Sequence, residues 1–304
     1  MADTSLKPVA AARPDPSAIL ELLKPITWFA PMWAFACGAV SAGQPLDGRW
    51  ALILAGIVLA GPLVCGTSQA VNDWYDRHVD AINEPGRPIP SGRIPGRWGL
   101  GIAVAWTVLS VVFAAALGPL VLVAAVVGLV LAWAYSAPPF RLKLDGWRGN
   151  AAVAACYEGL PWFTGATLMI GAMPRGEILA LAALYSVGAH GIMTLNDFKS
   201  IEGDRRMGVN SLPVQLGPER AARLACWVMA IPQVAVVILL LAWGRPVFAA
   251  AVAASLAVQL MLMLRLLDDP RANAPWYNAT GTSLYVLGMM VSAVAVGGLE
   301  GASP

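Results

Sequence analysis

Nine long apolar stretches constrain the fold of this 304-residue chain more than any other feature. About 20 consecutive apolar residues are needed to cross the roughly 30 Å hydrocarbon core of a bilayer. Stretches of about that length lie near residues 25–42, 51–71, 100–117, 119–135, 150–172, 178–195, 221–243, 247–267 and 278–299. Because backbone polar groups in lipid must be satisfied within helices, the sequence predicts an all-α, polytopic membrane protein: a nine-transmembrane-helix bundle with cytoplasmic cap loops.

Composition supports this membrane assignment. Charged residues make up 12% of the chain and hydrophobic residues 58%, whereas about 25% of a typical soluble domain is charged. The net charge of +2 gives no indication of a nucleic acid partner, and we expect none. Residues 1–24 lack an apolar core followed by a cleavage site. We therefore expect a cytosolic N-terminal extension over 1–24 and a single transmembrane domain over 25–304.

The four cysteines give no sign of a metal or redox site. They lie singly within apolar segments, at Cys37, Cys65, Cys156 and Cys226. Neither C-x-x-C spacing nor a clustered histidine accompanies them, so we expect buried, reduced thiols rather than a zinc site.

The distribution of basic residues predicts the orientation of the chain. Cytoplasmic loops near helix ends are enriched in Lys and Arg. With nine spans and a cytoplasmic N-terminus, 17 of the 20 basic residues fall on one side, and only Arg49, Arg175 and Arg245 fall on the other. We therefore expect a cytoplasmic N-terminus, a C-terminus on the opposite side, and large polar loops that face the cytoplasm.

An acidic motif ends the second apolar stretch, in the sequence GTSQAVNDWYDRHVDAINEPGRPIPSGR. On a helix at 100° per residue, five polar side chains share an arc of about 100°: Gln69, Asn72, Asp73, Asp76 and Asp80. Like charges this close raise one another's pKa unless a cation lies between them. Three carboxylates on one helical face therefore indicate a metal site.

A related motif ends the sixth stretch, in GAHGIMTLNDFKSIEGDRRMG. Aligned with the first motif, it repeats the asparagine and the outer two aspartates as Asn196, Asp197 and Asp204, with Ser200 in the place of the middle aspartate. On a continuing helix these side chains share a face, whereas Glu202 points away. Because the following glycine is able to break such a helix, Glu202 remains an alternative ligand.

Both motifs offer oxygen ligands without an attendant His or Cys, which favours a hard cation. Mg²⁺ prefers one or two carboxylates together with water and phosphate oxygens. Two such sites on one side of the membrane suit the clamping of a diphosphate whose departure leaves an allylic carbon open to a nucleophile. Solvated helix ends are the ordinary alternative for one motif, but two related motifs, each followed by basic residues, favour the metal site.

The two motifs resemble those of the UbiA superfamily of intramembrane prenyltransferases. The pattern N-D-x-x-D-x-x-x-D at 72–80 and the loop R-P-I-P-S-G at 87–92 resemble its first signature, and 197–204 resembles its D-x-x-x-D signature except for Ser200. The resemblance implies a Mg²⁺-dependent enzyme with Asp73, Asp76, Asp197 and Asp204 as catalytic residues. The implied metal ligands are Asn72, Asp73, Asp76, Asp80, Asp197 and Asp204.

Finer features resemble the chlorophyll synthase branch of that superfamily. They are Y-S-A-P-P-F-R-L-K at 135–143, L-P-W at 160–162 and N-D-F-K-S-I-E-G-D at 196–204, while K-P-I-T-W at 24–28 is most like bacteriochlorophyll synthases. The resemblance implies that the C17 propionate of a Mg-chlorin or bacteriochlorin acid attacks geranylgeranyl or phytyl diphosphate at the lipid bilayer. Such a carboxylate is already ionised at neutral pH, so no strong general base is required. A cell membrane or intracytoplasmic photosynthetic membrane, with pigment-binding membrane proteins as recipients of the ester, is the expected setting.

Basic residues beside the motifs are candidates for binding the diphosphate. Arg binds phosphate in a fork and Lys binds it as a point charge, although the positive-inside rule explains some of these residues equally well. The candidates are Arg87, Arg141, Lys143, Lys199 and Arg205.

Five further residues are candidates for contacting the acceptor or supporting the site: Tyr135, Glu158, His190, Asn196 and Glu202. Glu158 lies inside an apolar stretch, where an ionisable residue is costly and often functional. A structural hydrogen bond and a substrate contact both fit it. His190 precedes Asp197 by about two turns and is either a core histidine or a ligand of a chlorin magnesium.

Two other functions differ from this interpretation in testable ways. A transporter also carries intramembrane acids, but its site usually lies at the bilayer midplane, whereas these motifs lie at one surface. A UbiA-type enzyme that acts on a quinone-ring precursor or haem would differ only in its acceptor. The sequence does not distinguish a geranylgeranyl from a phytyl donor.

Overall fold

The computed structural model describes residues 13–299, and this part of the chain is helical apart from its connecting loops. Its first half contains α1 (Pro16–Leu22), η1 (Pro25–Thr27), α2 (Phe29–Ser41), α3 (Trp50–Val58), the π-helical η2 (Leu59–Cys65), α4 (Gly66–Asn83), α5 (Trp98–Leu117), α6 (Pro119–Ser136) and η3 (Leu142–Leu144). Its second half contains α7 (Gly146–Ala154), the π-helical η4 (Ala155–Gly159), α8 (Leu160–Ile170), α9 (Gly176–Asn196), η5 (Asp197–Ser200), α10 (Ile201–Met207), α11 (Leu212–Leu216), α12 (Pro218–Ala242), α13 (Pro246–Asp268) and α14 (Pro270–Gly297). The predicted all-α fold class is confirmed.

Seven helices in the described part are long and apolar enough to cross a membrane: Trp50–Asn83, Trp98–Leu117, Pro119–Ser136, Gly176–Met207, Pro218–Ala242, Pro246–Asp268 and Pro270–Gly297. The other two predicted spans, 25–42 and 150–172, correspond to α2 and to the continuous helix α7–η4–α8, and neither is among the seven. The chain is thus an integral membrane protein with seven candidate spans, two fewer than predicted. The difference arises because α2 has only 13 residues, and because α7–η4–α8 carries polar side chains at its start and Glu158 in its middle.

Local sequence explains where the long helices begin. Four of them start with proline, which has no amide hydrogen to leave unpaired in the first turn: α6, α12, α13 and α14. The predicted break between the third and fourth stretches is confirmed at Gly118, whose φ of 134° is a conformation that L side chains rarely adopt.

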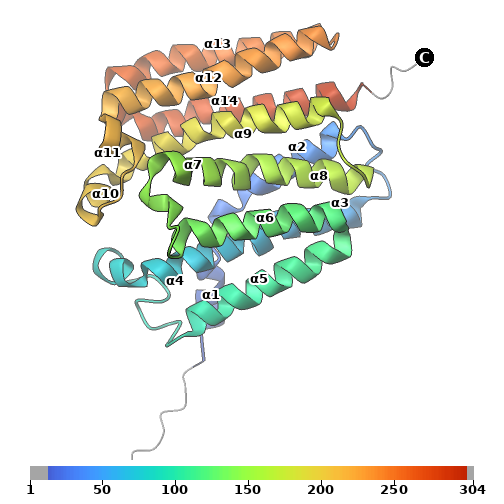
Figure 1. Ribbon diagram of the computed structural model, residues 1–304. Helices are drawn as coiled ribbons and strands as arrows, with labels where there is room; N and C mark the ends of the chain where they lie inside the picture. Colours follow the sequence, from blue (N-terminus) through green and yellow to red (C-terminus); the bar gives the residue numbers. More distant parts are fainter. Residues whose placement is uncertain (1–12, 300–304) are drawn as a thin grey trace, which may run out of the picture.

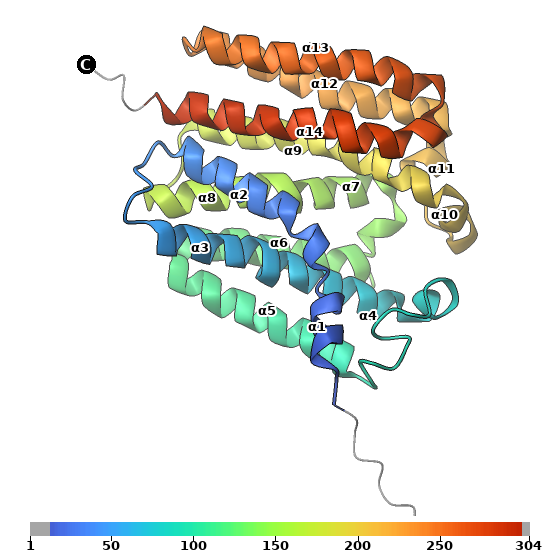
Figure 2. The same cartoon turned by 180° about the vertical axis from the view of Figure 1, so that it is seen from behind.

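The long helices lie side by side, and the functional loops gather at one end of the bundle. Figure 1 shows the end of α4, α10, α11 and the start of α7 together on the left, while the connections after α2 and α8 lie on the right. Seen from behind, α2 lies between α14 on one side and α3 on the other (Figure 2). Each of the two acidic motifs ends a long helix at the loop-rich end.

Two glycines allow α2 and α8 to cross closely. A Cβ atom at Gly38 would lie 1.9 Å from the carbonyl oxygen of Trp162, and one at Gly165 would lie 2.1 Å from that of Phe35. Small residues at such crossings let helix backbones approach in membrane proteins. This crossing holds α8 against the N-terminal part of the bundle. Because α7, η4 and α8 form one continuous helix, it also fixes the position of α7.

The part of the predicted N-terminal extension that the structure describes packs against the bundle. The Asp15 side chain caps α1 by accepting a hydrogen bond from the Ser17 amide (3.0 Å). Apolar residues of α1 are fully buried in one cluster with residues of α4 and α5. Glu21 forms a two-pronged ion pair with Arg93 (2.6 and 2.9 Å). Residues 1–12 of the extension lie outside the described part.

Candidate active site

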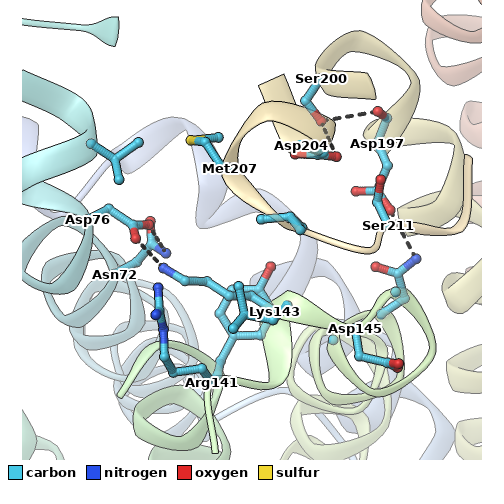
Figure 3. A pocket seen from close by; sticks show the side chains of 17 residues that line it. Asn72, Asp76, Arg141, Lys143, Asp145, Asp197, Ser200, Asp204, Met207 and Ser211 are labelled. Atoms are coloured by element: carbon cyan, nitrogen blue, oxygen red, sulfur yellow. Dashed lines mark hydrogen bonds and ion pairs between the residues drawn. The ribbon is translucent and has the colours of Figure 1, made fainter. Parts of the chain in front are cut away.

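A polar cavity of about 280 Å³ opens at the loop-rich end of the bundle. Figure 3 shows side chains from both acidic motifs facing it from opposite walls, with the loop after α6 beneath them. The residues that line it are Asn72, Asp76, Val79, Tyr135, Arg141, Lys143, Leu144, Asp145, Gly146, Gly149, Asn150, Asp197, Ser200, Asp204, Met207, Val209 and Ser211. The two motifs, far apart in sequence, therefore meet at one cavity.

The wall formed by α4 presents Asn72 and Asp76. The side-chain amide of Asn72 donates to Oδ2 of Asp76 (3.0 Å), one helical turn later, and to the Ser136 hydroxyl (3.2 Å). The other carboxylate oxygen of Asp76 forms an ion pair with Lys143. These bonds fix the Asp76 carboxylate at the edge of the cavity, beside a cation.

The opposite wall presents Asp197, Ser200 and Asp204. The helix tightens to a 3₁₀ turn over Asp197–Ser200 before α10 begins, so it is not the regular α-helix on which the sequence alignment was based. The Ser200 hydroxyl donates to the Asp197 carbonyl (3.1 Å) and to Oδ2 of Asp204 (3.0 Å). Both carboxylates of the second motif line the cavity, and Ser200 ties the Asp204 carboxylate to the backbone at Asp197.

Asp73 and Asp80 lie outside the cavity lining. Asp73 is buried against Lys24 (2.7 Å) and Arg87 (3.3 Å), and Asp80 contacts Arg87 at 2.9 Å. Helix geometry explains the split: counted from Asn72, Asp76 lies at about 40° around α4, whereas Asp80 and Asp73 lie at about 80° and 100°. The edge of the predicted face with Asn72 and Asp76 therefore meets the cavity, and the edge with Asp73 and Asp80 meets Lys24 and Arg87.

The predicted phosphate-binding residues separate into two groups. Arg141 and Lys143 line the cavity. Arg87 is occupied by carboxylates, including that of Glu84 beside it. Lys199 is exposed and not part of the lining, and Arg205 lies 3.7 Å from Glu202 on the surface. Of the five predicted cations, the two from the loop after α6 therefore lie at the cavity.

Burial and neighbouring charge act on these cations in different ways. Burial lowers the pKa of Lys143, although the adjacent Asp76 carboxylate acts in the opposite direction. For Arg87, burial also disfavours the charge, but the surrounding carboxylates outweigh it and raise the pKa. Lys143 thus stays at the cavity through its ion pair with Asp76.

The remaining candidates are mostly placed away from the cavity. Tyr135 lines it, whereas Asn196 accepts a hydrogen bond from Asn278 (2.9 Å). The ring nitrogen Nε2 of His190 lies 3.3 Å from the Trp147 carbonyl. Glu202 is exposed and within 4.0 Å of Arg271.

Glu158 lies inside the π-helical η4, away from the cavity lining. It is 6% exposed, and its Oε2 has no hydrogen-bond partner among residues 13–299. π-Helical turns are frequent at functional sites, and Glu158 combines such a turn with a buried carboxyl oxygen that has no partner in the described part. The cysteines, by contrast, are free thiols as predicted, three of them buried.

Three supporting residues were not selected from the sequence. Asn150 donates from Nδ2 to Oδ2 of Asp197 (3.3 Å) and to Thr194 (3.3 Å). Lys24 pairs with Asp73, and Ser211 lines the cavity. Asn150 had a signal, since Gly149-Asn150 follows the loop motif at 135–143 and belongs to the features that resemble the chlorophyll synthase branch. Lys24 opens the K-P-I-T-W motif at 24–28, but its contact with Asp73, like the place of Ser211 at the cavity, joins segments distant in sequence and was not predictable from it.

The donor set at the cavity fits Mg²⁺ shared with a phosphate ligand. Within residues 13–299, no group of three or more His, Cys, Asp or Glu side chains is placed to hold a metal ion by itself. Each wall instead offers one or two oxygen donors, from Asn72 and Asp76 and from Asp197 and Asp204. Mg²⁺ commonly binds through one or two carboxylates and completes its shell with water and phosphate oxygens. The residues therefore fit a metal that arrives with a diphosphate.

Comparison with known proteins adds independent findings. The UbiA prenyltransferase family model matches residues 29–292. The chain is 60% identical to the bacteriochlorophyll synthase 33 kDa chain of Cereibacter sphaeroides, over 94% of this chain and 95% of that protein. It is 52% identical to the protein of the same name from Rhodobacter capsulatus, over 98% and 99%. It is 40% identical to the chloroplastic chlorophyll synthase of Arabidopsis thaliana, over 91% and 73%.

Solved structures are similar in fold. A UbiA homologue from Archaeoglobus fulgidus bound to DMAPP and Mg²⁺ superposes with a TM-score of 0.74 at 21% identity, over 92% of this chain and 99% of that chain. The same homologue bound to GPP and Mg²⁺ gives a TM-score of 0.71. At this identity the likeness concerns the fold alone.

Proposed function

Because the chain belongs to the UbiA prenyltransferase family, we propose that it esterifies the C17 propionate of bacteriochlorophyllide with a geranylgeranyl or phytyl group taken from its diphosphate. Chlorophyllide is the closest alternative acceptor. This reaction is the last step of (bacterio)chlorophyll synthesis. The observation that carries the proposal is the meeting of both acidic motifs at one cavity in a chain 60% identical to a bacteriochlorophyll synthase.

The proposed metal ligands are the oxygen donors that face the cavity: Asn72, Asp76, Asp197 and Asp204. When bound, Mg²⁺ would neutralise the charge that develops on the departing diphosphate. Asp73 and Asp80, which the sequence also proposed as ligands, are placed to hold Lys24 and Arg87. Their proposed contribution is to keep α4 and the loop that follows it in position.

The chain's own residues then account for the rest of the reaction. Arg141, whose side chain has no partner among the described residues, and Lys143 would bind phosphate oxygens. The acceptor carboxylate is already ionised and needs no base. Its oxygen attacks the allylic carbon while the carbon–oxygen bond to the diphosphate breaks. The loops around the cavity would keep water from competing for that carbon.

The membrane arrangement is part of the same proposal. We propose that α2 and α7–η4–α8 complete a nine-span bundle, with residues 25–304 forming one transmembrane domain and the cavity facing the cytoplasm. The N-terminus would be cytoplasmic and the C-terminus on the opposite side, in the cell membrane or an intracytoplasmic photosynthetic membrane. Cysteine-accessibility labelling of the loops at the two ends would test this orientation.

Labelled geranylgeranyl diphosphate supplied with a panel of acceptors tests the activity. We expect the purified protein to form an ester with bacteriochlorophyllide, to lose activity on thorough removal of Mg²⁺, and to regain it when Mg²⁺ is restored. If the product were instead an alkylated quinone precursor or an alkylated haem, the proposed acceptor would be wrong and that compound would take its place. Turnover that persists without divalent ions would contradict the mechanism.

A further inference from the structure

Ser211 places a buried, unpaired hydroxyl in the wall of the cavity. The residue is 3% exposed, and its Oγ has no hydrogen-bond partner in the part of the chain that the structure describes. Burying an unpaired hydroxyl is destabilising. A native structure that keeps one therefore needs a reason for it, such as a ligand that binds there.

The backbone holds Ser211 beside the cavity without using its side chain. The preceding residue, Asn210, donates from its amide to the Leu144 carbonyl (2.9 Å) and accepts from the Gly146 amide (2.8 Å). Ser211 itself directly precedes α11, where a serine side chain commonly caps the helix, yet its hydroxyl makes no such bond. The side chain is thus positioned by its neighbours and retains its own capacity to donate.

The other polar groups of the lining are in a different situation. The amides, carboxylates and Lys143 described above all have partners within the protein. Tyr135 and Arg141 are half-buried, so water is able to solvate them. Among the lining residues, Ser211 alone has a side-chain atom in the set of buried polar atoms without a partner in residues 13–299.

We propose that the Ser211 hydroxyl donates a hydrogen bond to a phosphate oxygen of the prenyl diphosphate, an inference that rests on the proposed function. Ser211 lies shortly after α10, which carries Asp204, one of the proposed metal ligands of the diphosphate. A hydroxyl that donates to a charged oxygen forms a stronger bond than one between neutral groups.

Ser211→Ala tests the inference, with Ser292→Ala as the matched control. Ser292 is fully buried, but its hydroxyl is bonded to Tyr185 (2.8 Å) and to the Gly288 carbonyl (2.9 Å). Without ligand, we expect Ser211→Ala to melt at the wild-type temperature or above, since an unpaired group is removed, and Ser292→Ala to melt lower. With Mg²⁺ and inorganic pyrophosphate, we expect the Kd of Ser211→Ala to rise about tenfold and that of Ser292→Ala to stay unchanged.

Steady-state kinetics test whether Ser211 contacts the prenyl diphosphate or the acceptor. We expect Ser211→Ala to raise KM for geranylgeranyl diphosphate without changing KM for the acceptor, and Ser211→Cys, which keeps a weak donor, to be intermediate. An unchanged pyrophosphate Kd, or a melting temperature lowered as far as that of Ser292→Ala, would overturn the inference, as would a change in the acceptor KM alone. If wild-type protein bound no pyrophosphate with Mg²⁺, the proposed function itself would fail.

Discussion

The two acidic walls of the cavity carry the same kinds of residue, but they balance their charge differently. On α4, every carboxylate of the motif has a cation of the protein beside it: Asp73 with Lys24 and Arg87, Asp76 with Lys143, and Asp80 with Arg87. Across the cavity, Asp197 and Asp204 have no ion pair among residues 13–299 and accept hydrogen bonds from Asn150 and Ser200 instead.

This difference indicates that the two walls depend on a metal ion to different degrees. The α4 wall carries its own counter-charges, so it is able to fold and stay in place without a metal. The wall of η5 and α10 presents two carboxylates that form no ion pair with a protein cation among residues 13–299, and like charges that share a site repel unless a cation joins them. The second wall should therefore depend more strongly on Mg²⁺ than the first.

The largest effect is expected for Asp197→Asn. The change removes a carboxylate that has no ion pair among residues 13–299, so we expect prenyl transfer to fall by about 100-fold or more and the residual activity to require more Mg²⁺. Initial rates measured across a Mg²⁺ titration test this. The melting temperature of the metal-free protein should not fall, and a variant with wild-type Mg²⁺ dependence would remove the proposed distinction between the walls.

Asp73→Asn should instead act mainly on stability. It leaves Lys24 facing a neutral amide and removes one of the carboxylates around Arg87, and removal of one partner of a buried pair is costly. Because Lys24 and Arg87 are each about a quarter exposed, we discount that cost and expect a loss of about 1–3 kcal/mol. Chemical denaturation in detergent measures it, and activity per folded molecule separates this effect from the catalytic role that the sequence predicts for Asp73.

The exposed partner of Arg87 supplies the control for that experiment. Glu84 has a side chain that is 56% exposed, and surface ion pairs contribute little to stability. Glu84→Gln should therefore change the free energy of unfolding by less than about 0.5 kcal/mol. Equal losses for the two variants would show that the buried pairs do not stabilise the α4 wall.

Asn150→Ala should have a smaller effect on the second wall. Its amide orients one oxygen of Asp197, and loss of an orienting partner outside the metal's own ligands weakens metal binding by about tenfold. We expect a rise of that order in the Mg²⁺ concentration for half-maximal rate. Thr194→Val removes the other hydrogen-bond partner of Asn150 and should change this Mg²⁺ concentration by less than about twofold. A larger change in Thr194→Val would show that the effect of Asn150→Ala comes from altered packing.

The smallest effect is expected for Glu202→Gln. The side chain is exposed, and its nearest cations are surface arginines, so we expect rates and Mg²⁺ dependence within about twofold of wild type. The same Mg²⁺ titration tests this. A strong effect would restore Glu202 as the alternative ligand that the sequence left open.

Much of the site could be predicted from the sequence because short-range spacing on a helix decides which side chains share a face. Asn72 and Asp76 are one turn apart and do meet the cavity together. The same reasoning failed to separate Asp73 and Asp80 from them, since an arc of about 100° includes both edges of a face. Lys24 and Arg87 contact the edge of α4 that carries Asp73 and Asp80, which leaves the other edge for the cavity. Helical periodicity does not predict these contacts, because both cations lie outside α4.

The sequence by itself determined that the chain is helical and membrane-embedded, and that two acidic helix ends lie on one side, because hydropathy and helical periodicity are local properties. The tertiary structure decided that Asp76 faces Lys143, that Asp73 faces Lys24, and that Ser211 remains unpaired. Those contacts join segments dozens of residues apart or more, and only the packing of the whole bundle sets which charges are neutralised within the protein and which await a ligand.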